Sequence, residues 1–248
     1  MAVLLVVAAT ALPGSSAGQD FTSADYGRSL VVETFALIGP EVADPAMRYA
    51  GNNLACQSCH IHGGRIDRGL ALVGVSAKYP MPLPGGGSES LADRINGCMT
   101  RSMNGRPLPE GGAEMRAFVA YLELLTADAG GYGNPAEDPV PLPAAATPPD
   151  PVHGEQRYLQ VCAACHRDDG SGMRNGQPGD ALGYLHPPLW GPDSFNAAAG
   201  MHRLATAAAF IHDNMPPGAN AAAPVLTPQD AWDIAAFIDA QPRPPAPE

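Results

Sequence analysis

The feature that most constrains this chain is a five-residue pattern, Cys-x-x-Cys-His, that occurs twice. The two copies are Cys56-Gln57-Ser58-Cys59-His60 and Cys162-Ala163-Ala164-Cys165-His166. Two thiols one helical turn apart can form thioethers with the vinyl groups of haem, and the following histidine can bind the iron. A redox dithiol would not need the histidine, and a zinc site built from both pairs would leave two histidines over. The pattern predicts two covalently bound haem c groups.

The two motifs are the centres of an internal repeat. Each follows a helical stretch and precedes a loop rich in glycine and proline, which ends in an amphipathic helix. We expect these helices at about 25–37 and 113–128 in the first half, and at 152–162 and 227–240 in the second. This order of elements resembles, twice over, that of small c-type cytochromes, in which the first and last helices cross beside the haem. The predicted fold is all-α, with two consecutive cytochrome c-like domains.

Composition sets the expected domain boundaries. We predict a processed signal segment at 1–20, domains at 21–133 and 152–241, a proline-rich linker at 134–151, and a tail at 242–248. The apolar stretch Met1–Thr10 is too short to span a bilayer, which takes about 20 residues. It is typical of a secretory signal, cut near Ala17. These features predict export to the periplasm, with no membrane span after processing.

The formal net charge of −11 argues against a nucleic-acid partner, which requires a basic face. The charge is uneven along the chain. Residues 21–133 carry 9 basic and 11 acidic side chains, whereas residues 152–248 carry 5 and 10. The acidic second half suits docking to a basic partner surface.

Each haem iron needs a second axial ligand, and its identity tunes the reduction potential. In the second half the candidates are Met215, Met201, His202 and His212. Met215 is favoured, because it precedes Pro216 in a stiff loop 49 residues after His166. In the first half the odd cysteine, Cys98, lies 38 residues after His60. It is the candidate ligand, and the alternatives are Met81, Met103, or a buried cysteine without a role.

Several segments resemble the dihaem thiosulfate dehydrogenase family, over about residues 25–240. They are Gly51-Asn52-Asn53-Leu54, Gly63-Gly64, Leu72-Val73-Gly74-Val75, Arg94 through Gly105, Pro187 through Asn196, and Gly200-Met201. The resemblance implies a catalytic first haem with His60 and Cys98 as ligands, and an electron-transfer haem with His166 and Met215. It places Arg94 and Ser102 near the substrate. Asn214 occupies the place of a lysine that competes for the second iron in some members, so ligand switching is not expected.

The resemblance implies a thiosulfate:cytochrome c oxidoreductase, which oxidises two thiosulfates to tetrathionate and in some members also runs in reverse. The electron acceptor would be a soluble c-type cytochrome or a partner cytochrome subunit. One departure concerns the anion site, because residues 79–87 lack the arginines usual in the family. Positive charge for an anionic substrate would then come from other residues. The candidates are Arg94, Arg65, Arg68, Arg101 and Lys78.

Two other functions fit parts of the sequence. A dihaem electron carrier without its own substrate would explain the missing arginines. A dihaem cytochrome c peroxidase would need an iron with an open distal position, so that function fails if Cys98 is a ligand.

Overall fold

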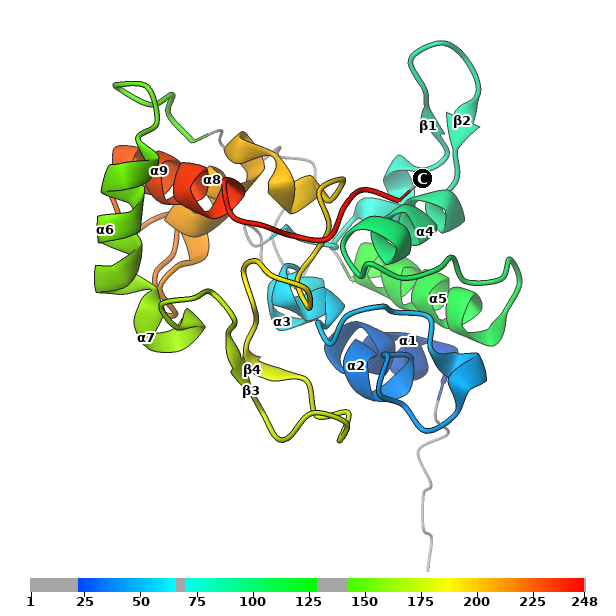
Figure 1. Cartoon of the computed structure of the whole chain (residues 1–248). Coiled ribbons are helices and arrows are strands. Elements are labelled where there is room, and N and C mark those ends of the chain that lie inside the picture. Colours follow the sequence, from blue (N-terminus) through cyan, green and yellow to red (C-terminus); the bar gives the residue numbers. More distant parts are fainter. Residues whose placement is uncertain (1–21, 66–69, 129–141, 248) are drawn as a thin grey trace, which may run out of the picture.

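The computed structural model describes residues 22–65, 70–128 and 142–247 (Figure 1). The expected signal segment and residues 134–141 of the expected linker lie outside these ranges. The described α-helices are α1 (Ser23–Val32), α2 (Thr34–Leu37), α3 (Ile61–Gly64), α4 (Leu91–Arg101), α5 (Ala113–Ala127), α6 (Pro151–Val161), α7 (Ala163–His166), α8 (Leu204–Asn214) and α9 (Pro228–Asp239). The 3-10 helices are η1 (Pro45–Met47), η2 (Cys56–Ser58), η3 (Val75–Lys78) and η5 (Gly200–His202).

Strands are few and very short. β1 (Met81–Pro82) pairs antiparallel with β2 (Ser88–Glu89), and β3 (Met173–Arg174) pairs antiparallel with β4 (Tyr184–His186). The mainly helical fold confirms the expected class. None of the described helices is long and apolar enough to cross a lipid bilayer.

Buried apolar side chains form two separate clusters. One lies within residues 22–128, which we call the first lobe, and the other within residues 142–247, the second lobe. In the first lobe α1 packs on α5, and in the second α6 packs on α9. The expected crossing of the first and last helices is therefore present in each lobe.

A glycine lies at each helix crossing. A Cβ atom at Gly27 would lie 2.0 Å from the carbonyl oxygen of Ala117, and one at Gly154 would lie 1.9 Å from that of Asp233. Only a residue without a side chain allows two backbones to approach so closely. The internal repeat of the sequence therefore corresponds to two helix crossings that pack in the same way, each through a glycine.

The helix ends follow local sequence signals. Thr22 and Asp25 form a capping box at α1, and Thr227 and Asp230 form another at α9. The first helical stretch is broken at Glu33 into α1 and α2. One helix, α4, was not expected, although Ser90 and Asp93 cap it in the same way.

The described part of the expected linker lies against α9. The Nε1 of Trp232 donates to the carbonyl of Pro143 at 2.9 Å, and the backbone N–H of Thr147 donates to Gln229 at 3.0 Å. Pro151, placed in the linker from the sequence, is already the first residue of α6. The expected tail also packs, because Pro242 accepts a hydrogen bond from the backbone N–H of Gly191.

Polar contacts join the two lobes. Arg174 Nη2 lies 2.7 Å from both carboxylate oxygens of Glu41 in the first lobe, and Arg174 Nη1 lies 3.5 Å from Asp193 Oδ2 within the second lobe. The backbone N–H of Asn53 donates to Asp193 Oδ1 at 3.0 Å. Charge-assisted hydrogen bonds of this kind are stronger than neutral ones, so they fix the lobes at a defined position.

Candidate functional site

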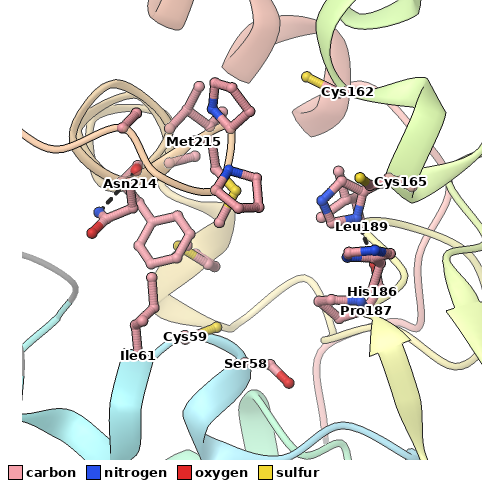
Figure 2. A pocket seen from close by; sticks show the side chains of 18 of the residues that line it. Ser58, Cys59, Ile61, Cys162, Cys165, His186, Pro187, Leu189, Asn214 and Met215 are labelled. Atoms are coloured by element: carbon pink, nitrogen blue, oxygen red, sulfur yellow. Dashed lines mark hydrogen bonds between the residues drawn. The ribbon is translucent and has the colours of Figure 1, made fainter. Parts of the chain in front are cut away.

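A cavity of about 770 Å³ lies at the centre of the second lobe and reaches the first. Cys162, Cys165, His166 and Met215 all line it. Figure 2 shows Met215 on one side and Cys165 and Pro187 on the other. The second motif and the favoured methionine therefore face each other across one space. Its volume suits a large, mostly apolar ligand.

The histidine of the second motif is held for ligation through one nitrogen. Nδ1 of His166 lies 2.8 Å from the carbonyl oxygen of Pro187, and the side chain is 8% exposed. A hydrogen bond to that carbonyl places the proton on Nδ1 and leaves Nε2 to bind a metal. Burial lowers the pKa of His166, which favours the neutral form that ligates.

The first motif has the same arrangement. Nδ1 of His60 lies 2.5 Å from the carbonyl oxygen of Leu70. Burial lowers the pKa of His60, and the positive charge of Arg94 lowers it further. These two carbonyl partners, Leu70 and Pro187, could not be found from the sequence, because every residue has a backbone carbonyl.

The cysteines fit haem attachment better than either alternative. All five are free of disulfides. Burial raises the pKa of Cys56 and Cys162 to about 11 and that of Cys59 to about 12, whereas a redox dithiol needs a lowered value. Among residues 22–65, 70–128 and 142–247, no three His, Cys, Asp or Glu side chains gather as a metal site would require.

Two of the four candidates for the second iron ligand in the second lobe line this cavity, and both are methionines. Met215 follows the last residue of α8, and Met201 also lines the cavity. The other two candidates, His202 and His212, are not among the residues that line this cavity.

In the first lobe Cys98 lies close to the haem motif. It is on α4, and its charge would raise the pKa of both Cys56 and Cys59. The two alternative ligands differ in their surroundings. Met103 is 3% exposed within the apolar core, and Met81 is 37% exposed in β1. The structure thus brings Cys98 and the first motif together, and the role of Cys98 as a haem ligand stays a prediction.

The two residues predicted near the substrate are also on or beside α4. The positive charge of Arg94 acts to lower the pKa of both His60 and Tyr79, so Arg94 lies near the first motif. Ser102 follows the last residue of α4, and its carbonyl accepts a hydrogen bond from the Asn52 side chain at 3.0 Å. The structure thus places Cys98 and Arg94 on α4 and Ser102 directly after it.

The segment of the first haem motif also lines the cavity of the second lobe. Ser58, Cys59 and Ile61 line the cavity of the second lobe, as Figure 2 shows. A haem held by Cys162 and Cys165 would therefore lie against the segment that holds the other haem. The thiols, the oriented histidine and the apolar volume together fit a covalently bound haem in the second lobe.

Known proteins agree with this arrangement. Residues 152–241 match the family model of cytochrome c. Thiosulfate dehydrogenase of Allochromatium vinosum is 37% identical over 97% of this chain and 84% of its own length. That of Stutzerimonas stutzeri is 35% identical over 95% of this chain and 71% of its own length.

A solved structure is similar as well. A thiosulfate dehydrogenase from Marichromatium purpuratum superimposes with a TM-score of 0.68 at 33% identity, over 88% of this chain. This chain spans 45% of that protein. The shared motifs, fold and sequence lead to one conclusion: the chain is a c-type cytochrome that belongs to the thiosulfate dehydrogenase family.

Proposed function

We propose that the chain joins two thiosulfate ions into one tetrathionate ion by forming a sulfur–sulfur bond, with release of two electrons. The observation that carries this proposal is the position of Cys98 and Arg94 beside the first haem motif, in a member of this family. When bound, the haems supply two one-electron redox centres, so that the electrons can leave singly.

The residues of the first lobe would bind and orient the substrate. Thiosulfate carries two negative charges, and the guanidinium of Arg94 attracts it toward His60 and Cys98. Cys98 would complete the ligand set of the first haem together with His60. Ser102, at the end of the same helix, would supply a hydroxyl group near the bound anion.

The second lobe would receive the electrons and deliver them to an external acceptor. A methionine ligand raises the potential of a haem relative to a thiolate ligand, so electrons would run downhill from the first lobe to the second. We propose a soluble c-type cytochrome or a partner cytochrome subunit as acceptor, since the acidic second half suits a basic docking face. These reactions would take place in the periplasm.

The direct test is an assay of the purified holoprotein. Thiosulfate should reduce ferricyanide in its presence, and a reduced dye should be oxidised when tetrathionate is added. A protein that reacts with neither substrate, although both haems are bound, would instead be an electron carrier. Peroxide-dependent oxidation of a reduced cytochrome would instead show that the protein is a dihaem cytochrome c peroxidase.

Replacement of Met215 should change the reduction potential of the second haem and leave that of the first haem unchanged. We expect Met215→Ala to lower the potential of the second haem by an order of 100 mV, because thioether ligation favours the reduced iron. Redox titration followed by optical spectra measures the shift. Met201→Ala is the matched control, since it removes a methionine from the same cavity. A shift in the control but not in Met215→Ala would assign the ligand to Met201.

A further inference from the structure

A second cavity lies where the two lobes meet at α4, and its lining is strongly basic. It encloses about 220 Å³. Arg94 and Arg101 line it from the first lobe, and residues 197–200, His202 and Arg203 line it from the second. None of these lining residues carries a carboxylate. We call this cavity the arginine pocket.

The arginine pocket adjoins the proposed site of chemistry. Arg94, Cys98 and Arg101 follow one another at intervals of four and three residues, which places them along one face of α4. A neighbouring face carries Ile95 and Met99, both buried in the core of the first lobe. The pocket and the sulfur of Cys98 are therefore on the same side of the helix.

A glycine sets the direction of the Arg101 side chain. A Cβ atom at Gly97 would lie 2.6 Å from Arg101 Nη2, so the guanidinium folds back over the preceding turn of α4. Gly97 lies between Arg94 and Arg101 in the helix. The charge of Arg101 is thus turned along the helix toward Arg94.

The second lobe is fixed over this helix by one buried side chain. Asn196 is 1% exposed, and its Nδ2 donates to the carbonyl of Thr100 at 2.9 Å and to Asn104 Oδ1 at 3.2 Å. Its backbone N–H donates to the carbonyl of Arg101 at 3.2 Å. These bonds hold the start of the segment 197–203 against the end of α4.

The arginines lack acidic partners within the part of the chain that the structure describes. His202 pairs with Asp239, but no ion pair involves Arg94, Arg101 or Arg203. α8 begins next to Arg203, and its first turn has neither an acidic residue nor a side-chain cap. The three arginines repel each other, and a bound dianion would remove that repulsion.

We propose that the arginine pocket binds thiosulfate, a doubly charged sulfur oxoanion, with Arg101, Arg203 and His202 as specificity-determining residues beside Arg94. This inference rests on the proposed function. It also accounts for the lack of arginines at 79–87, because charge from the second lobe would replace them. Arginine suits the role, since its planar fork makes paired hydrogen bonds to oxoanions.

The test compares two double variants of the holoprotein that remove the same charge. Arg101→Gln with Arg203→Gln should raise the KM for thiosulfate at least about tenfold, with kcat changed less than about threefold. Arg28→Gln with Arg116→Gln, on the exposed surfaces of α1 and α5, should change neither. An unchanged KM in the first variant would overturn the proposal while thiosulfate oxidation itself stands.

A binding measurement separates this inference from the proposed function. Sodium sulfate, an inert dianion, should raise the melting temperature of the oxidised wild type more than sodium chloride of equal ionic strength. The Arg101→Gln, Arg203→Gln variant should lose this difference, and the charge-matched control should keep it. If the protein does not oxidise thiosulfate at all, the sulfate measurement alone still tests whether the arginine pocket binds a dianion. Loss of the difference supports the pocket, and its retention overturns it.

Discussion

Cys98→Ala should lower the rate of thiosulfate oxidation at least about 100-fold while both haems stay attached. The thiol lies on α4 near Cys56 and Cys59, and it stands outside both Cys-x-x-Cys-His motifs. As the proposed ligand of the first haem, this thiolate would lower the potential of that haem, and the substitution would remove the effect. The measurements are ferricyanide reduction with thiosulfate and the haem content after acid-acetone extraction.

Electron paramagnetic resonance of the oxidised protein at low temperature gives an independent measure of the ligands of the first haem. The wild type should show a low-spin signal of thiolate ligation, and Cys98→Ala should lack it. Met103→Leu is the control, because it removes the alternative sulfur from the core of the first lobe at little cost in volume. Full activity in Cys98→Ala, together with loss in the control, would assign the ligand to Met103.

Gly154→Ala should reduce the free energy of unfolding by about 3 kcal/mol. The new Cβ atom would lie 1.9 Å from the carbonyl oxygen of Asp233 and 2.5 Å from its carbonyl carbon. Both are backbone atoms, so α6 and α9 would have to move apart. Denaturant unfolding followed by circular dichroism measures the change. Gly27→Ala should behave alike at the crossing of α1 and α5.

Gln156→Ala is the control for this substitution, because it changes an exposed position of the same helix. Its effect should stay within about 0.5 kcal/mol. Equal stabilities of Gly154→Ala and Gln156→Ala would show that α6 and α9 can move apart without a loss of folding stability. The crossing would then not require a glycine.

Local patterns predicted much of this protein. The haem motifs, the helices that open and close each lobe, and the facing positions of His166 and Met215 depend on short-range spacing or on a resemblance. The helix α4 is not among the helices predicted from the sequence, although Leu91, Ile95 and Met99 recur at helical intervals. Gly97 obscured it, since glycine costs a helix about 1 kcal/mol relative to alanine. In the structure Gly97 makes room for the side chain of Arg101.

Long-range contacts could not be predicted in this way. Arg203 is about a hundred residues from Arg101 in the chain, and no periodicity connects them. Arg101 was among the candidates for anion binding, but Arg203 and His202 were not. Only the position of the second lobe on α4, fixed by Asn196, brings these charges together.

The sharing of both cavities between the lobes limits how such a protein can evolve by exchange of modules. Each lobe has its own apolar core, so a chimaera with a foreign cytochrome as its second half could still fold and mature. It would lack Asn196 and Arg203, and its haem would no longer lie against Cys59. Exchange of one lobe alone would therefore change the lining of both cavities.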